Sequence, residues 1–402
     1  MDAVALIVTG YDIRRAERPL KLRASLQDLG YAAHIVHVAE QGHPLAHRIR
    51  LAAALIAHSA GFASVENAAR IYPGYRALVA AGRGHERADL VISHGWQALA
   101  PAAALARRFG ARLIHDAVEG RRWEFSRSSV TGSALGRFSE AMEARFLRDC
   151  AAVMSPSPGF LKMRTDELPP GTPSAVIANA APAGVLADAP VPARDIVSVA
   201  YQGLALGNRD LGPLIANATA NWPKGTRLDL MLAGPHRLDR TRPGARTGAT
   251  LAFHPPAPAD AQVSALIDLG AAIGLCVFDP ADMQLRLADP NKLYNYMAAG
   301  MAVLATAGTR SGEVVAEAGA GIVLDDHRPE TVRRAVASLV EDPASLAQYR
   351  SNALAFARAH AWESQTGTLA GLLEAVGLPV SRSAPEPTAY GAASPAHPPA
   401  DT

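Results

Sequence analysis

The chain contains 402 residues, 49% of them hydrophobic, and carries a formal net charge of +2. That length exceeds what one hydrophobic core usually supports, so we expect two domains of roughly 150–200 residues each. The near-neutral charge offers no general attraction to nucleic acid, and the two distant cysteines, Cys150 and Cys276, indicate neither a disulfide framework nor a zinc site.

The sequence contains no pattern for secretion or for a membrane span. Residues 1–10 lack a basic segment followed by a long apolar stretch, and no uninterrupted apolar run approaches the roughly 18–20 residues of a spanning helix. We therefore expect a cytoplasmic protein. A peripheral contact with the inner face of the membrane stays open, because residues 121–129 mix arginines with Trp123 and Phe125. A solvated loop beside the binding site is the alternative interpretation of that segment.

Short apolar runs separated by helix-length segments recur along the whole chain. In the first half they are Val4–Thr9, Ala33–Val38, Leu90–Ser93, Ala111–His115, Ala152–Ser155 and Ala175–Ala178. In the second half they are Ile196–Tyr201, Leu228–Ala233, Thr250–His254, Ala272–Val277, Ala302–Thr306 and Gly321–Leu324. Near-continuous apolar strands that alternate with helices indicate parallel sheets covered on both faces. We therefore predict an α/β protein with two Rossmann-like domains that face each other across a cleft.

Two shifts in composition mark the limits of these domains. A stretch rich in proline and alanine separates the two series of strands, and we place a linker at 181–195 between domains at 1–180 and 196–360. Residues 378–402 are again rich in proline and alanine and contain almost no large apolar side chains. Such a composition predicts a disordered tail.

The first predicted strand ends at Gly10, where a bound phosphate can approach the backbone. A glycine that only permits the turn after the strand is an equally good interpretation. The segment that follows has no G-x-G-x-x-G pattern, which disfavours a dinucleotide-dependent dehydrogenase. Four early histidines (His34, His37, His43 and His47) have no acidic or cysteine companions, so we predict no metal site.

Polar side chains follow the third and fourth predicted strands. His94 comes directly after one strand, and Asp116 and Glu119 come after the next. Ligands of open parallel sheets bind beyond the carboxyl ends of the strands, so we expect these three residues at a binding cleft. There a carboxylate serves as a general base or accepts a hydrogen bond from a substrate hydroxyl. Helix capping, or an ion pair with Arg121 or Arg122, is the alternative for both carboxylates.

The segment Asp289–Gly300 (DPNKLYNYMAAG) combines a helix start with a polar first turn. Asp289 is predicted as the N-cap and Pro290 as the first helical residue, with the apolar side chains at 293, 296 and 297 on one buried face. The polar side chains of the first turns, where helix amides attract anions, are Asn291, Lys292 and Asn295. We predict a phosphate contact for Lys292, with a solvated lysine at a helix start as the alternative.

Several of these stretches resemble one known family. DLVISHGWQALAPAAALARRFGARLIHDAVE, at residues 89–119, is similar to the N-terminal domain of family-four retaining nucleotide-sugar glycosyltransferases, which have the two-domain GT-B fold. VAYQGLALGNRDLGPLI, LMLAGPH, AIGLCVF and DPNKLYNYMAAGMAVLAT follow the order and spacing of that family's donor domain. The resemblance spans residues 1–376 and implies that a C-terminal helix at 361–376 crosses back onto the N-terminal domain.

The resemblance implies transfer of a sugar from a nucleoside-diphosphate sugar to an acceptor hydroxyl, with retention at the anomeric carbon. It implies a glycan, lipid-linked or small-molecule acceptor, in the synthesis of cell-surface polysaccharide or glycoconjugate. Arg209 stands where the family has a basic residue that holds the donor diphosphate, and Lys292 is placed to share that task, so no metal or other cofactor is required. We place Gly10, Asn291, Asn295 and His254 at the same donor-nucleotide site.

Three positions depart from the family pattern. Asn295 stands where a ribose-binding glutamate is usual, Leu287 replaces a second acid, and Val118 replaces a histidine that contacts the donor sugar. These departures leave two hypotheses. In the first, Asp116 acts at the reaction centre as a base on the acceptor hydroxyl, which would fit inversion. In the second, the protein is a catalytically degenerate sugar-nucleotide-binding or scaffold protein. We expect an active enzyme, because alignment and stabilisation of the donor diphosphate do most of the work in retaining transfer. A sugar-nucleotide epimerase ranks last, since its chemistry needs more acids and bases in the cleft.

Overall fold

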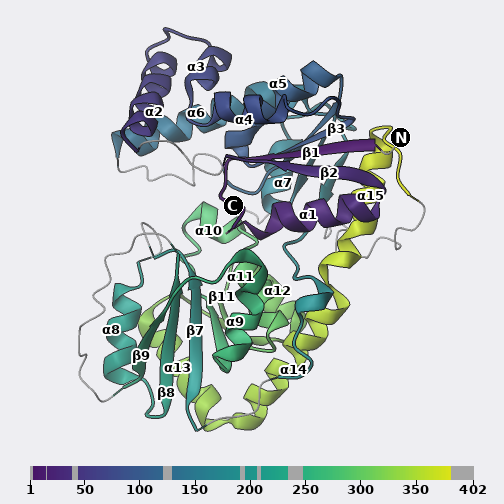
Figure 1. Cartoon of the computed structure of the whole chain (residues 1–402). Helices are drawn as coiled ribbons and strands as arrows, with labels where there is room; N and C mark the ends of the chain where they lie inside the picture. The colour runs from purple at the N-terminus through teal and green to yellow at the C-terminus, as the bar shows by residue number, and fades with distance from the viewer. Residues whose placement is uncertain are drawn as a thin grey trace, which may run out of the picture.

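The computed structural model describes residues 3–14, 16–38, 44–120, 129–190, 195–205, 210–233 and 248–381. They form two α/β domains, one above the other in Figure 1, each built on a six-stranded parallel sheet with helices on its faces. The predicted fold class is confirmed. No helix within these ranges is both long and apolar enough to cross a membrane.

The N-terminal sheet has the strand order β2-β1-β3-β4-β5-β6. Its strands are β1 (Ala3–Thr9), β2 (Tyr31–Val36), β3 (Leu90–His94), β4 (Arg112–Asp116), β5 (Ala152–Ser155) and β6 (Ser174–Val176). Its helices are α1 (Glu17–Asp28), α2 (Pro44–Ser59), α3 (Val65–Ile71), α4 (Tyr75–Gly82), η1 (Trp96–Ala98), α5 (Leu99–Phe109), α6 (Val130–Phe146), η3 (Leu147–Asp149) and α7 (Pro158–Thr165). The order reverses between β1 and β3, which makes the carboxyl ends of these two strands the topological switch point.

The C-terminal sheet has the order β12-β11-β10-β7-β8-β9, which is the classic dinucleotide-binding order when counted from β7. Its strands are β7 (Val197–Gly203), β8 (Thr226–Leu232), β9 (Thr250–His254), β10 (Ala271–Cys276), β11 (Ala302–Thr306) and β12 (Gly321–Leu324). Its helices are α8 (Gly212–Asn221), η5 (Ala259–Ala261), α9 (Gln262–Asp268), α10 (Met283–Leu287), α11 (Asn291–Ala298), α12 (Arg310–Ala318) and α13 (Pro329–Glu341). All twelve predicted strands are present, and the switch point of this sheet lies between β7 and β10.

The chain crosses between the domains twice. The short turn η4 (Ala183–Val185) lies on the first passage; on the second, α14 (Pro343–Ala359) leaves the lower domain in Figure 1 and continues through η6 (Trp362–Gln365) into α15 (Thr366–Ala375) beside the N-terminal sheet. Trp362 and the leucines of α15 are buried in the same core as β1 and β3. The residues after α15 also pack here: Leu378 is buried, and the Tyr31 hydroxyl donates to the carbonyl of Pro379 at 2.7 Å. The predicted disorder is therefore wrong for 378–381, and residues 382–402 lie outside the described ranges.

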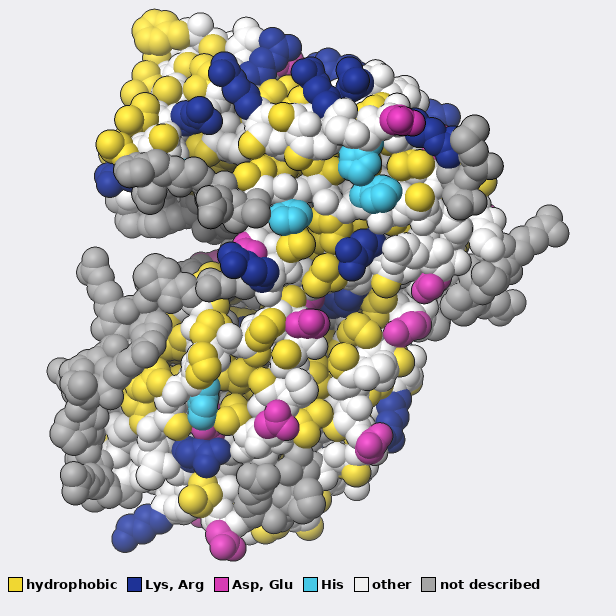
Figure 2. Space-filling view, in the orientation of Figure 1, with side chains coloured by type: hydrophobic (Ala, Val, Ile, Leu, Met, Phe, Trp, Pro, Cys, Tyr) yellow, Lys and Arg dark blue, Asp and Glu magenta, His cyan; other side chains and the backbone are white. Residues whose placement is uncertain are grey.

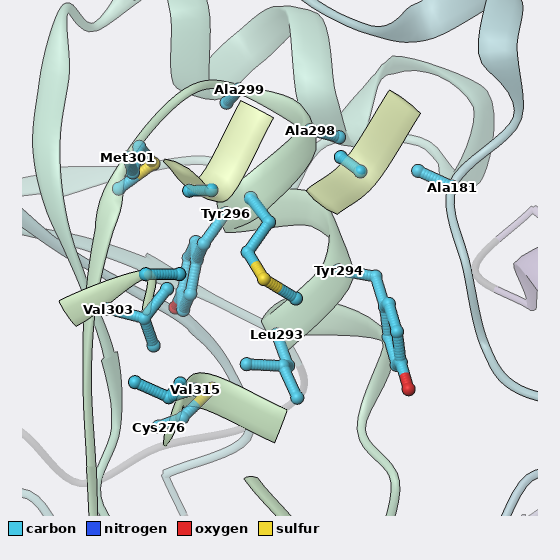
Figure 3. Packing of buried hydrophobic residues seen from close by; sticks show 14 of the residues in the cluster. Ala181, Cys276, Leu293, Tyr294, Tyr296, Ala298, Ala299, Met301, Val303 and Val315 are labelled. Carbon is cyan, nitrogen blue, oxygen red and sulfur yellow. The ribbon is translucent and has the colours of Figure 1, made fainter. Parts of the chain in front are cut away.

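Helix α11 is seated by apolar contacts on nearly every side (Figure 3). The predicted inward face is confirmed, because Leu293, Tyr296 and Met297 are all fully buried. The predicted start is wrong: Pro290 is the N-cap, and α11 begins one residue later. The Asp289 carboxylate does not cap the helix, because it accepts hydrogen bonds from the Tyr294 hydroxyl at 2.8 Å and from the Asn179 amide at 3.2 Å.

Gly274 of β10 allows α11 to lie against the sheet. A Cβ atom at this position would come within 2.4 Å of the Tyr296 ring. The Tyr296 hydroxyl in turn accepts a hydrogen bond from the Gln202 backbone amide at 2.8 Å, which ties the helix to the end of β7. The missing side chain at 274 therefore fixes how closely the first turn of α11 approaches the switch point.

We expect Gly274→Ala to lower the free energy of unfolding by roughly 1–3 kcal/mol, because overpacking forces the ring and its helix to move. Gly371→Ala is the control, because a Cβ atom on this α15 residue meets nothing within 4 Å. It should be neutral or stabilising by up to about 1 kcal/mol through helix propensity. Urea unfolding of both variants measures the difference, and equal midpoints would contradict the packing argument.

Candidate functional site

A cavity of about 390 Å³ lies between the two domains, at the carboxyl ends of both sheets. Figure 2 shows a furrow at this level between the two lobes of the molecule. The N-terminal domain contributes Tyr11, Glu17, Arg18, His94, Val118 and Glu119. The C-terminal domain contributes residues at the end of β7, in α9 and at the start of α11, among them Gln202, Gly203, Gln262, Asn291 and Lys292. We call this cavity the cleft.

Lys292 brings a buried positive charge to the cleft from the first turn of α11. The residue is 8% exposed, and its ammonium nitrogen has no hydrogen-bond partner among the described residues. That nitrogen lies 3.8 Å from the centre of the Tyr201 ring and 5.4 Å from that of Phe278, which offsets part of the cost of burial. Gly203, with φ of 133°, lets the end of β7 pass close to it. An unpartnered ammonium at a helix N-terminus is suited to bind an anion.

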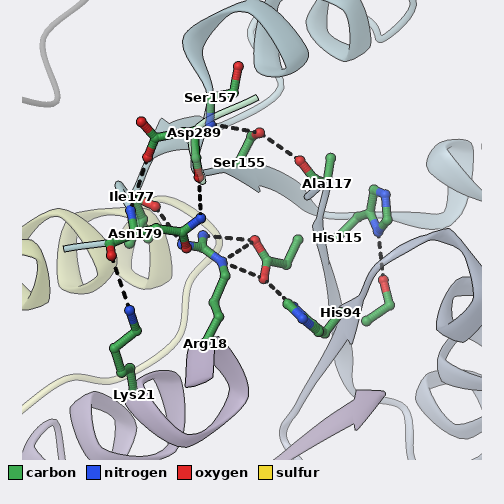
Figure 4. Close-up of polar contacts among 12 residues, drawn as sticks. Arg18, Lys21, His94, His115, Ala117, Ser155, Ser157, Ile177, Asn179 and Asp289 are labelled. Carbon is green, nitrogen blue, oxygen red and sulfur yellow. Dashed lines mark hydrogen bonds and ion pairs between the residues drawn. The ribbon is translucent and has the colours of Figure 1, made fainter. Parts of the chain in front are cut away.

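Asp116 is the centre of a buried ionic cluster, and its partners Arg18 and His94 are labelled in Figure 4. The Arg18 guanidinium of α1 donates to both of its oxygens, at 2.8 Å from Nε and 2.9 Å from Nη2. His94 Nδ1 lies 2.7 Å from Oδ2, so the carboxylate fixes the proton on Nδ1 and leaves Nε2 as the free nitrogen of the ring. The remaining guanidinium nitrogen donates to the Ile177 carbonyl at 2.6 Å and to Asn179 Oδ1 at 3.0 Å. Arg18 thus joins α1, β4 and the segment that leads out of the N-terminal domain.

This cluster argues against the predicted role of Asp116 as a base on the acceptor hydroxyl. Its side chain is fully buried, it does not line the cleft, and both oxygens are already bonded. Burial alone raises the pKa of Asp116, but the charge of Arg18 and the hydrogen bond from His94 outweigh it and hold the pKa well below its usual value. His94 stands between Asp116 and the cavity and is the member of the pair that reaches it. Asp116 therefore orients His94.

Glu119 lines the cleft in the loop after β4. The Tyr11 hydroxyl donates to its Oε1, whereas the buried Oε2 has no donor among the described residues. The loop is held from below by the buried Arg164, which donates to the Glu119 carbonyl and to the Glu143 carboxylate at 2.9 and 3.0 Å. The alternative ion pair with Arg121 or Arg122 falls outside the described residues. Glu119 therefore offers one free carboxylate oxygen to a ligand.

Asn295 is almost completely buried and lies behind the wall of the cleft. Its side-chain amide donates to Glu17 Oε1 and to Gln262 Oε1, both at 3.0 Å. Gln262 also accepts from the Gln202 side chain at 2.6 Å, and Gln202 Oε1 is buried without a donor among the described residues. Glu17, Gln202 and Gln262 reach the cavity, whereas Asn295 supports them. None of these three residues was predicted at the site. Gln202 lies in the stretch VAYQGLALGNRDLGPLI, which assigns it no role, and for Glu17 the charged first turn of α1 is the one visible signal.

The other residues predicted for the donor-nucleotide site do not lie together in the structure. Asn291 lines the cleft beside Lys292. Gly10 lines a different cavity in the N-terminal domain. His254 is turned away at the end of β9, where Nε2 lies 2.7 Å from the buried Asp229 carboxylate. Arg209 lies outside the described residues.

We expect Arg18→Met to lower the free energy of unfolding by about 3–5 kcal/mol near neutral pH, because it leaves the Asp116 carboxylate buried without its partner. Adding Asp116→Asn should recover part of this loss by removing the unpaired charge. Because the pKa of Asp116 is lowered in the fold, the contribution of the pair should fade as the pH falls below the ordinary carboxylate range. Denaturant unfolding of both variants, repeated at acidic pH, measures these effects. An unchanged free energy of unfolding in Arg18→Met would contradict a stabilising role for the Arg18–Asp116 pair.

Comparisons with known proteins agree with this architecture. Residues 15–180 match the model of a glycosyl transferase 4-like domain. No curated protein matches the sequence. Among solved structures, sucrose-phosphate synthase from Thermosynechococcus elongatus has a TM-score of 0.69 at 13% identity, over 92% of this chain and 98% of that chain. Anabaena HepE in complex with UDP-glucose has a TM-score of 0.64 at 14% identity, over 92% of this chain and 99% of that chain.

The same fold also occurs in a protein described by a different reaction. A putative UDP-N-acetylglucosamine 2-epimerase from Listeria monocytogenes has a TM-score of 0.54 at 14% identity, over 96% of this chain and 100% of that chain. At such identities the structures show the shared fold alone, and the family match shows the domain type. The predicted resemblance is confirmed: the chain carries a glycosyl transferase 4-like domain within the two-domain GT-B fold of glycosyltransferases.

Proposed function

We propose that the protein transfers a sugar from a nucleoside-diphosphate sugar, bound in the cleft, to a hydroxyl group of an acceptor. The observation that carries the proposal is the buried Lys292 ammonium, which faces the cleft without a hydrogen-bond acceptor among the described residues. The glycosyl transferase 4-like domain at 15–180 supplies the reaction class. The HepE structure, solved with UDP-glucose, supports this class of donor.

The diphosphate of the donor belongs at the start of α11. There the Lys292 ammonium and the N-terminal end of the helix both favour negative charge. Asn291 lines the cleft next to them, and Arg209 stays a predicted second cation. We propose that these groups stabilise the leaving diphosphate in the way a divalent metal ion does in other transferases, so that no metal is required.

The hydroxyl groups of the donor belong near the side chains that Asn295 supports. Gln202 Oε1 has no donor in the part of the chain that the structure describes, and Glu17 brings a carboxylate from the N-terminal domain into reach of the C-terminal domain. A carboxylate and amide oxygens are the acceptors that ribose or hexose hydroxyls require. We propose that Glu17 supplies the negative charge that the asparagine at position 295 lacks.

The reaction centre belongs between His94 and Glu119. The bond between the anomeric carbon and the diphosphate oxygen breaks, and the acceptor hydroxyl oxygen forms the new bond to that carbon. With retention, which the family resemblance implies, the hydroxyl proton passes to the departing diphosphate. Glu119 Oε2 and His94 Nε2 then align hydroxyls of the sugar and the acceptor, and Asp116 holds the histidine in position. Proton NMR of the first-formed product distinguishes retention from inversion.

The biological setting remains as the sequence predicts it: a cytoplasmic enzyme that acts in polysaccharide or glycoconjugate synthesis. A catalytically degenerate binding or scaffold protein is the second candidate, and one observation favours it: the Asn295 amide is already committed to Glu17 and Gln262. Turnover of a donor by the purified protein would exclude that candidate.

We expect Lys292→Ala to weaken the binding of the nucleoside diphosphate by roughly 10- to 100-fold, the usual worth of a charge-assisted hydrogen bond. Lys224→Ala is the matched control, because Lys224 is exposed in the turn before β8 of the same domain. Calorimetry with UDP, GDP, ADP and dTDP identifies the nucleotide and measures both variants. Equal binding by Lys292→Ala and the wild type would refute the diphosphate site.

We expect Glu119→Gln to lower kcat by about 10- to 100-fold, because a neutral amide aligns a hydroxyl less strongly than a carboxylate. Its affinity for the nucleoside diphosphate without a sugar should stay unchanged, which separates alignment from misfolding. Glu86→Gln, at an exposed position of the same domain, serves as the control. A parallel loss of nucleotide affinity would assign Glu119 a structural role instead.

A further inference from the structure

A second cavity, of about 470 Å³, lies within the N-terminal domain next to the cleft. Its walls come from the ends of β1 and β2, the first turns of α2, the start of α4 and η1. Tyr11 lines both this cavity and the cleft, so its side chain stands where the two spaces meet. We call the second cavity the side pocket.

The side pocket is mainly apolar and has a rigid wall. Val38, Ala46, Ala77 and Leu78 line it together with the ring of Tyr72. That ring is braced by Trp96 and Phe138, with ring centres 5.4 and 5.7 Å away. The volume and the lining match sites that hold most of a small molecule through its apolar surface. A bare sugar, which carries hydroxyls on every side, suits such walls poorly.

The polar groups of the side pocket all favour an anion or a hydroxyl. Arg50 and His47 enter it from α2, and none of its described lining residues is acidic. Gln97 Oε1 is buried and has no donor among the described residues. A ligand with a negative group near Arg50 and a hydroxyl near Gln97 would satisfy both.

The side pocket opens where the proposed reaction takes place. The Tyr11 hydroxyl bonds to Glu119, and the Tyr11 ring lies 5.4 Å from the His94 ring. Gly10, the residue before it, has no side chain to narrow the connection; a Cβ there would meet only the Gln97 Cβ, at 3.5 Å. A molecule held in the side pocket therefore ends beside the two residues that align the transfer.

We infer that the side pocket binds the acceptor, and that the acceptor is an amphiphile with an apolar or aromatic body, an anionic group and a reactive hydroxyl. The inference rests on the proposed function and adds the class of acceptor to it. Its body fills the space between α2 and α4, its anionic group faces Arg50, and its hydroxyl reaches past Tyr11 toward the anomeric carbon.

The first test uses 8-anilinonaphthalene-1-sulfonate, an aromatic anion that becomes fluorescent when it leaves water. We expect one binding site in the wild type. Ala77→Trp and Ala46→Trp, which fill the pocket from opposite helices, should each raise its dissociation constant at least tenfold. Arg50→Gln should raise it about three- to tenfold, whereas Arg48→Gln, on the same helix outside the pocket lining, should leave it unchanged.

A competing surface provides the decisive control. The outer side of α2 and the turn after it expose Leu45, Ile49, Ile56 and Phe62, and Figure 2 shows hydrophobic side chains gathered there at the upper left. Ile56→Ser should not affect the probe. Loss of binding in Ile56→Ser with normal binding in both tryptophan variants would overturn the inference, because it would place the probe on this surface.

The second test reads out transfer. With the donor identified by calorimetry, 6-hydroxy-2-naphthoate should gain the mass of one sugar residue, and Ala77→Trp should abolish that product while nucleotide binding stays normal. Equal product from Ala77→Trp would overturn the inference. A failure of the proposed function can be told apart from a failure of this inference, because the wild type itself would then bind no donor.

Discussion

The buried ion pair of Arg18 with Asp116 is the interaction on which the rest of the site depends. A buried guanidinium needs an acceptor for each of its donors, and here β4 and the segment after β6 supply them. Asn179, bound by Arg18, in turn donates to the Asp289 carbonyl at 2.6 Å, just before α11. A continuous chain of hydrogen bonds therefore runs from the N-terminal sheet to the helix that carries Lys292. The neighbouring Lys21 strengthens it by donating to two carbonyls of the same segment; burial lowers the pKa of this lysine to about 8.

This chain of contacts gives the cleft two chemically different sides. The C-terminal side presents a cation and a helix N-terminus, which favour the phosphates of a donor. The N-terminal side presents the free oxygen of Glu119 and the ring of His94, which favour hydroxyls. Glu17 links the two sides, because its carboxylate on α1 of the N-terminal domain accepts a hydrogen bond from Asn295 of the C-terminal domain. The departure from the family pattern at position 295 is thus accompanied by a carboxylate from another part of the chain.

The side pocket, which we propose as the acceptor site, is a cavity distinct from the cleft. Its arginine belongs to α2, and its apolar walls belong to α2, α4 and the segments after β2 and α3, none of which lines the cleft. Among the described residues, Tyr11 alone lines both cavities, so in the proposed reaction the reacting ends of donor and acceptor meet beside it. Such separation lets the two substrates be recognised independently and brought together only at the reaction centre.

The sequence by itself determined the fold class, all twelve strands and the buried face of α11, because these follow from hydrophobic periodicity, which is a local property. It also placed His94, Glu119, Asn291 and Lys292 at the cleft, because local sequence patterns predict where strands end and helices begin. Only the tertiary structure showed that Asp116 is neutralised by Arg18, that His254 is bound to Asp229, and that Glu17 reaches Asn295. These outcomes depend on partners distant in the chain, and no local pattern encodes which distant charge will meet a buried carboxylate.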